Sequence, residues 1–165
     1  MSDHEAIAVR AVSSRSNGRI AQWRAAWICL ALALALHVTD EALTGFLPVY
    51  NGVVEGIRSE RPWVPLPTFS FLVWLAGLVL GVLLLLTLTP VVSRGARWIR
   101  VVSLILSVVM ILNALGHVGA SLYWGRLAPG VYSSPFLFIA AVALLVTASR
   151  AKVLVGAQGR EMRAP

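Results

Sequence analysis

Residues 25–47 read AAWICLALALALHVTDEALTGFL, an apolar run that is interrupted near its end by His37, Asp40 and Glu41. The run is long enough to cross a membrane as a helix, since about 20 apolar residues span the hydrocarbon core. Ionisable side chains are costly in hydrocarbon, so those found inside a span usually face a partner or a cavity. Positions i, i+3 and i+4 of a helix share one face, so these three side chains point the same way. The stretch predicts a membrane helix that carries a buried polar site.

The composition favours a membrane protein over the whole chain. Of the 165 residues, 58% are hydrophobic and 13% are charged, and the mean hydropathy is +0.81. Long apolar stretches with charge only between them are typical of integral membrane proteins. The net charge of +7 does not indicate nucleic-acid binding, because the basic residues collect at the ends of the apolar runs. The single cysteine, Cys29, excludes an intrachain disulfide.

Four apolar runs predict an all-α fold, a four-helix transmembrane bundle over residues 21–150. The predicted spans cover residues 24–46, 68–89, 98–123 and 131–149. The remaining segments are a disordered tail over residues 1–20, a polar connection over residues 48–67 and a second tail over residues 151–165.

The first apolar run also resembles a signal peptide, which is the competing interpretation. Arginines precede its apolar core, and Ala33-Leu34-Ala35 resembles a cleavage site. Against this, the region before the core is long, and apolar character resumes at Ala42. Cleavage would also leave an odd number of spans, which fits the distribution of positive charge less well.

Basic residues give the orientation of the predicted bundle. Eleven lysines and arginines lie in the two tails and the second loop, whereas three lie in the first and third loops. Cytoplasmic loops carry the excess of Lys and Arg, so both termini are predicted to be cytoplasmic.

A second polar pair, Asn113 and His117, lies in the third predicted span with i, i+4 spacing. At about 1.5 Å per residue, His37 and Glu41 lie roughly 16 and 22 Å from the start of their span. Asn113 and His117 lie roughly 18 and 24 Å from the start of theirs. Both spans run outward, so the two pairs share one layer of the membrane. We expect them to meet at one buried site.

Three chemistries suit this set of side chains. In the first, His37, Glu41 and His117 hold a divalent metal, with Asp40 or Asn113 as a further ligand or as a residue that orients the ligands. Imidazole and carboxylate ligands suit zinc, our first expectation, and also iron or manganese. In the second, no metal is present, and Glu41, His37 and Asp40 act as acid and base in catalysis or proton relay. In the third, hydrogen bonds only hold the helices together.

The motif His37-x-x-Asp40-Glu41 near the outer end of a first span resembles that of the HXXEE family of small bacterial integral membrane proteins. Asn113-x-x-x-His117 and the Pro129-Gly130 turn before the last span are also similar to that family's pattern. Asp40 occupies a position where the HXXEE motif has Glu. The aspartate keeps the negative charge, but its side chain is shorter. The resemblance covers residues 34–145. It implies a polytopic protein of the bacterial plasma membrane with an expected metal site, and it supplies no substrate.

The leading functional hypothesis is an intramembrane enzyme that acts on a lipid or another hydrophobic small molecule entering between helices. Hydrolysis by a metal-activated water and isomerisation by proton shuttling both remain open. A transporter or proton-coupled subunit is the second class, although four spans show no internal duplication and a homodimer would have to supply the symmetry. A structural membrane protein without turnover is the third.

The charge distribution predicts the outcome of a topology experiment. Reporter fusions placed after Arg61 and after Arg126 should report the outside of the membrane, and a fusion after Arg97 should report the inside, because basic loops are retained in the cytoplasm. An outside signal from the N-terminal segment, or cleavage near Ala35, would contradict the predicted topology.

Overall fold

The computed structural model describes residues 3–151, with side chains described from residue 17 onward, and this part of the chain contains helices and no strand. The helices are α1 (Asp3–Thr44), α2 (Phe46–Glu60), α3 (Phe71–Thr87), α4 (Thr89–Ser93), α5 (Arg97–Trp124) and α6 (Ser134–Arg150). The prediction of an all-α protein is confirmed. The predicted C-terminal tail lies outside the described residues, except for its first residue.

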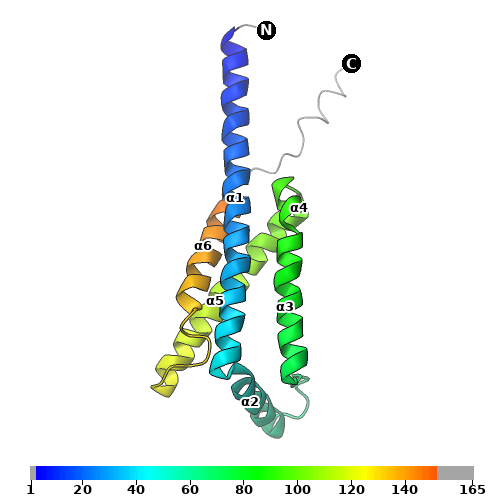
Figure 1. Cartoon of the computed structure of the whole chain (residues 1–165), viewed down its shortest axis with the longest axis vertical. Coiled ribbons are helices and arrows are strands. Elements are labelled where there is room, and N and C mark those ends of the chain that lie inside the picture. Colours follow the sequence, from blue (N-terminus) through cyan, green and yellow to red (C-terminus); the bar gives the residue numbers. More distant parts are fainter. Residues whose placement is uncertain (1–2, 152–165) are drawn as a thin grey trace.

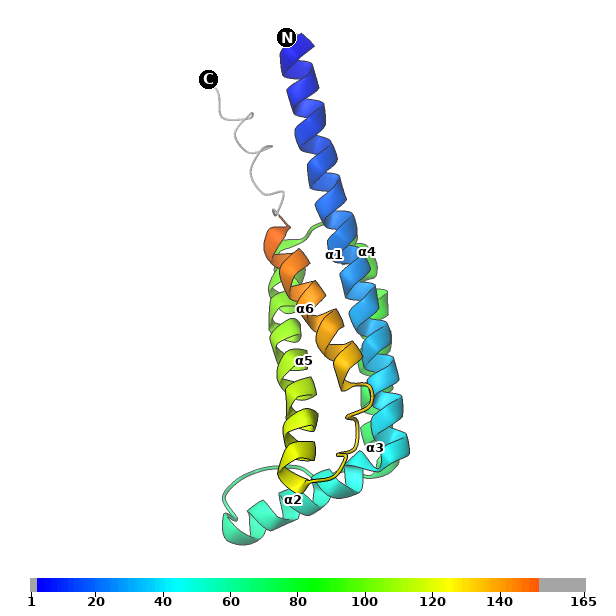
Figure 2. The same cartoon turned by 90° about the vertical axis from the view of Figure 1, so that its left-hand side faces the viewer.

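Helix α1 lies at the centre of the molecule (Figure 1). It packs against α6, α3 and α4, while α5 packs against α6. Helices α1 and α5 run in one direction and α3 and α6 in the other (Figures 1 and 2). The start of α1 and the end of α6 therefore lie at the same end of the molecule, and α2 crosses the opposite end.

The apolar core follows one face of α1, where Trp23, Trp27 and Leu30 are fully buried at helical spacing. Each indole N–H needs a partner when it is buried. The Nε1–H of Trp23 donates to Oγ of Ser103 in α5 (3.1 Å), and that of Trp27 donates to the carbonyl of Leu85 in α3 (2.7 Å). The two tryptophans thus connect α1 to α5 and to α3.

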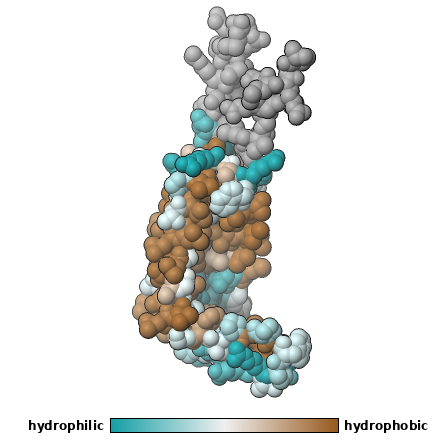
Figure 3. Space-filling model, turned by 90° about the vertical axis from the view of Figure 1, so that its right-hand side faces the viewer, coloured by the Kyte–Doolittle hydropathy of each residue, from teal (hydrophilic) through white to brown (hydrophobic). Residues whose placement is uncertain are grey.

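On the face shown in Figure 3, the surface of the helices is apolar between two hydrophilic ends. Three helical segments are long and apolar enough to cross a membrane, and α6 is a shorter apolar helix. The three segments are Asn17–Thr44, Phe71–Ser93 and Arg97–Trp124. On α3, large apolar side chains such as Leu72, Leu80 and Leu84 are exposed. Exposed apolar surface of this extent suits lipid and does not suit water.

Helix α6 begins at Ser134, whereas the predicted span began at residue 131. Its 17 residues rise about 25 Å, which is less than the hydrocarbon thickness of about 30 Å. Residues 125–133 precede it as a non-helical turn, in which Ala128, Gly130 and Ser133 are buried. Non-helical backbone at membrane depth is tolerated where protein covers it.

Residues 1–20 were expected to form a disordered tail, but α1 runs without a break from Asp3. The segment contains no proline that would end a helix. The first apolar run therefore continues a helix that begins before it.

Residues 48–67 were expected to be an irregular connection, yet α2 fills most of this segment. Leu47, Tyr50, Val54 and Ile57 recur at helical spacing, with Leu47 and Val54 buried, and the charged residues lie on the exposed side. This is the pattern of an amphipathic helix that lies in a membrane interface. Figure 2 shows α2 lying across the end of the other helices.

Gly45 makes the sharp turn between α1 and α2 in the left-handed conformation, with φ 78° and ψ 40°. Gly45→Ala should lower the free energy of unfolding by about 1–2 kcal/mol, because a Cβ is strained in this conformation. Gly52→Ala is the matched control: Gly52 lies within α2 with open space around it, and alanine there should stabilise the helix by up to about 1 kcal/mol. Unfolding in detergent measures both. Equal stability of the two variants would contradict the left-handed conformation of Gly45 in this turn.

Candidate metal site

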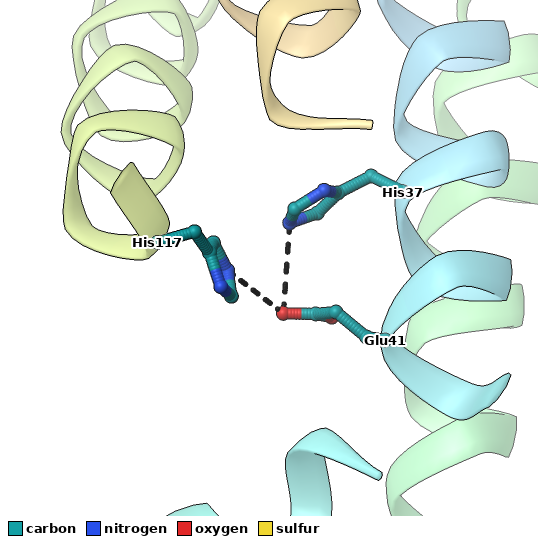
Figure 4. A group of neighbouring side chains, drawn as sticks. All are labelled: His37, Glu41 and His117. Carbon is teal, nitrogen blue, oxygen red and sulfur yellow. Dashed lines mark ion pairs between the residues drawn. The ribbon is translucent and has the colours of Figure 1, made fainter. Parts of the chain in front are cut away.

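Three ionisable side chains meet between α1 and α5: His37, Glu41 and His117 (Figure 4). They are only 1%, 5% and 7% exposed. Glu41 Oε1 lies 3.5 Å from His37 Nε2 and 3.1 Å from His117 Nε2. One ligand atom from each residue falls within 4.8 Å of the others, so the group could hold a metal ion. The buried His/Glu cluster expected from the sequence is present.

Helical spacing explains how these three side chains come together. His37 and Glu41 lie one turn apart on α1, so they share a face. On α5 the buried positions are spaced three, four or seven residues apart, and His117 is the last of them. The buried positions are Ile99, Ser103, Ser107, Ala114 and His117. His117 therefore projects from the same face of α5 that packs into the protein interior.

Asp40 contacts the residue that precedes α6. Its Oδ2 accepts hydrogen bonds from the backbone N–H of Ser133 (2.8 Å) and from the Ser133 hydroxyl (2.7 Å). Ser133 immediately precedes α6, so the carboxylate satisfies a donor at a helix N-terminus, where the helix dipole favours negative charge. The side chains of adjacent helical residues diverge by about 100°. Asp40 was predicted as a further metal ligand or as a residue that supports the ligands, and in the structure it bonds Ser133.

Ser133 is the polar residue of the site that the sequence interpretation missed. Its Oγ lies 2.8 Å from Nδ1 of His37, which is 96 positions away in the sequence. The available signal was local: a serine just before a helix whose first turn contains proline is typical of an N-cap. That signal predicts the start of a helix but not a contact with His37.

Within the described part of the chain, two buried side-chain atoms have no hydrogen-bond partner: His37 Nε2 and Asn113 Oδ1. Leaving such an atom unpaired costs about 1–3 kcal/mol, so each one needs an explanation. His37 uses its other nitrogen for Ser133, and its free Nε2 faces Glu41 Oε1. Asn113 was predicted to support His117, and no hydrogen bond between the two is found among the described residues.

Gly130 packs directly against the cluster. A Cβ at this position would lie 2.8 Å from His117 Cε1 and 3.0 Å from Glu41 Cγ, and the residue has φ +81°. Its backbone N–H donates to Oγ1 of Thr44 (3.1 Å), which anchors the turn to the end of α1. Both the close approach and the left-handed backbone require glycine here.

Residues 27–145 match the family model described as "Protein of unknown function with HXXEE motif". The chain belongs to the HXXEE family. The matched region extends from α1 to α6 and contains the whole cluster together with the turn at Gly130. No curated protein and no solved structure matches the chain.

The HXXEE motif of this chain, His37-x-x-Asp40-Glu41, contacts two neighbouring helices. His37 and Glu41 face His117 of α5, while Asp40 binds the start of α6 through Ser133. Ser133 also contacts His37, so the fourth position of the motif is linked to the first through a residue of the turn. The motif thus joins α1 to α5 and to the start of α6 by polar contacts.

Replacing Gly130 should disturb the cluster more than replacing another left-handed glycine. Gly125 also has positive φ, 61°, but open space surrounds it, so Gly125→Ala reports the backbone strain alone. Gly130→Ala adds an overlap with His117 and Glu41, and overpacking of this kind costs about a further 1–3 kcal/mol. Unfolding of the two variants in detergent gives the difference. An equal loss of stability in Gly125→Ala and Gly130→Ala would contradict the close packing of Gly130 against His117 and Glu41.

Proposed function

We propose that this HXXEE protein holds a divalent metal ion at His37, Glu41 and His117 within the membrane and uses it on a lipid-soluble substrate. The observation that carries the proposal is the buried Nε2 of His37. Its ring is fixed through Nδ1 by Ser133, and within the described residues Nε2 has no hydrogen-bond partner. Nε2 faces a carboxylate oxygen at 3.5 Å. A cation between them would satisfy both atoms.

The type and spacing of the donors support a metal ion. Tetrahedral bonds of about 2.0–2.1 Å place neighbouring ligand atoms about 3.3 Å apart. The two separations between nitrogen and oxygen, 3.5 and 3.1 Å, lie on either side of this value. Two imidazoles and one carboxylate form the donor set of catalytic zinc sites with one open position, and also of non-haem iron sites. Zinc is our first expectation, with iron or manganese as the alternatives.

Charge balance also favours a divalent ion. A single ionised carboxylate in hydrocarbon is costly. Here Glu41 contributes one negative charge directly. Asp40 contributes another through the Ser133 hydroxyl, which contacts both Asp40 and His37. Two carboxylates match the charge of a divalent ion, so the occupied site would be close to neutral and tolerable at low dielectric.

The surroundings of the cluster favour a substrate that arrives from the lipid. Figure 3 looks into a hollow between apolar columns formed by α3 and α5, with hydrophilic residues at its lower end. The ring of Phe46 lies 5.5 Å from that of His117 and 6.1 Å from that of Trp74 on α3, so aromatic side chains extend from the cluster towards α3. We propose that an apolar molecule reaches the cluster from this side. A bound ion would polarise its carbonyl or phosphoryl oxygen or activate a water.

A metal-free acid/base site is the second candidate. It is favoured by the 3.1 Å between His117 Nε2 and Glu41 Oε1, a distance at which the two atoms would share a proton. Glu41 and the histidines would then pass a proton to and from a substrate, as in an isomerase or a proton-coupled transporter subunit. A purely structural role for the cluster is the third candidate, and the experiment below distinguishes the metal site from both.

We also propose four membrane spans with both termini in the cytoplasm of a bacterial cell. The apolar character of α6 and the charge distribution support this proposal. A further support is that the start of α1 and the end of α6 lie at one end of the molecule (Figure 1).

Purified protein should carry close to one divalent metal ion per chain, with zinc the first expectation. His37→Ala, Glu41→Ala and His117→Ala should each remove most of it, because a dry site seldom replaces one of three ligands. Glu55→Ala is the control, since Glu55 is exposed on α2 and should leave the metal content unchanged. Elemental analysis after purification without chelators measures the metal content of each variant. Asn113→Ala should retain the ion, because its amide is not among the three ligands.

A second measurement tests the same proposal without variants. Removal of the ion by a chelator should lower the melting temperature, because a ligand that binds only the folded state stabilises it. Absence of metal above background, together with a melting temperature that the chelator does not change, would overturn the metal site. The acid/base or structural candidate would then replace it.

A further inference from the structure

We propose that Ser133 is a positioning residue which, with Asp40, fixes His37 in the tautomer that presents a lone pair at Nε2. The inference rests on the proposed metal site and extends it to the residues that prepare His37 for the ion. Ser133 precedes α6 and comes from the turn that packs over the cluster. Its hydroxyl lies between the Asp40 carboxylate and the His37 imidazole.

The assignment follows from counting protons on the Ser133 hydroxyl. The hydroxyl has one proton and three polar neighbours: Asp40 Oδ2 at 2.7 Å, His37 Nδ1 at 2.8 Å and the Gly130 carbonyl at 3.2 Å. An ionised carboxylate can only accept, and charge-assisted hydrogen bonds are the stronger ones. The Gly130 carbonyl already accepts a hydrogen bond from Ser134 at 2.8 Å. The proton of Ser133 therefore goes to Asp40.

Once that proton is committed, the Ser133 oxygen can only accept from His37. His37 must then carry its proton on Nδ1, and in the neutral ring Nε2 is left with a lone pair. This is the nitrogen that faces Glu41 and has no hydrogen-bond partner in the described part of the chain. Metal-binding histidines usually donate their second N–H to a carboxylate or carbonyl, which fixes the tautomer and the ring. Here a serine hydroxyl connects the imidazole to the carboxylate.

Asp40 is held firmly enough to fix the direction of the serine proton. It accepts two hydrogen bonds from the same residue, one from the backbone N–H and one from the hydroxyl of Ser133. The backbone N–H belongs to the start of α6, so the carboxylate cannot turn away without leaving a helix-terminal donor unpaired. The orientation of His37 therefore depends on the docking of α6 against α1.

Ser134 provides a matched control for a purely structural role. It is the neighbouring residue, it is as buried as Ser133, and its hydroxyl donates to the Gly130 carbonyl. Both serines thus stabilise the turn, but only Ser133 contacts His37. Ser133→Ala should weaken metal binding by about 10–100-fold, the usual effect of removing the partner of a ligating histidine. Ser134→Ala should leave metal affinity nearly unchanged even where it lowers the melting temperature.

Two variants of Asp40 test the direction of the serine proton. Asp40→Ala removes the acceptor and frees the hydroxyl to donate to Nδ1, so Nε2 should become protonated and metal affinity should fall. Asp40→Asn keeps an acceptor oxygen and should behave more like the unchanged protein. Ser133→Thr keeps the hydroxyl and should restore metal binding relative to Ser133→Ala.

The closing experiment is nitrogen NMR of ¹⁵N-histidine-labelled, metal-free protein in detergent, together with zinc titration of the same samples. The chain has three histidines, and the His37 signals are assigned with His37→Gln. The metal-free protein should show His37 with its proton on Nδ1, and Asp40→Ala should move the proton to Nε2. A proton on Nε2 in the unchanged protein would overturn the positioning role, whether or not zinc binds. The expected tautomer without zinc binding would overturn the metal site and leave the Ser133 contact standing.

Discussion

Ionisable side chains inside a membrane-spanning helix are costly unless they find polar partners, and this constraint accounts for how α1, α5 and α6 meet. His37, Glu41 and His117 face one another, and the Asp40 carboxylate is bonded to Ser133. The partners come from different helices. Separating any one of the three helices would leave charged or polar groups of the other two in contact with lipid.

The same constraint acts on the backbone of the turn between α5 and α6, which lies at the depth of the cluster. Three of its backbone N–H groups are satisfied by side chains of the adjoining helices: Ala128 by Ser121, Gly130 by Thr44, and Ser133 by Asp40. Irregular backbone inside a membrane needs such partners, since lipid offers none. The turn is therefore stabilised by α1 as much as by its own helices, which explains why its glycine can pack so closely on the cluster.

The cluster could be predicted from the sequence because its members obey helical spacing and equal depth, which are local properties of each span. The role of Asp40 could not be predicted in this way, because its partner Ser133 is 93 positions away in the sequence. Ser133 lies in a turn, and residue spacing does not predict the path of a turn. Helix α2 was missed for a different reason. Its charged residues suggested a loop, whereas the recurrence of Tyr50, Val54 and Ile57 at helical spacing was the stronger signal.

Two adjacent acidic residues at the end of one motif have different electrostatic partners in this fold. Asp40 and Glu41 diverge by about 100° around α1, so Asp40 meets the N-terminal end of α6 and Glu41 meets two imidazoles. The helix terminus supplies backbone donors that stabilise a carboxylate without any ion. The histidine side supplies two imidazoles, and Nε2 of His37 has no hydrogen-bond partner among the described residues. A bound cation would therefore be held by Glu41 and the histidines, and Asp40 is linked to His37 through Ser133.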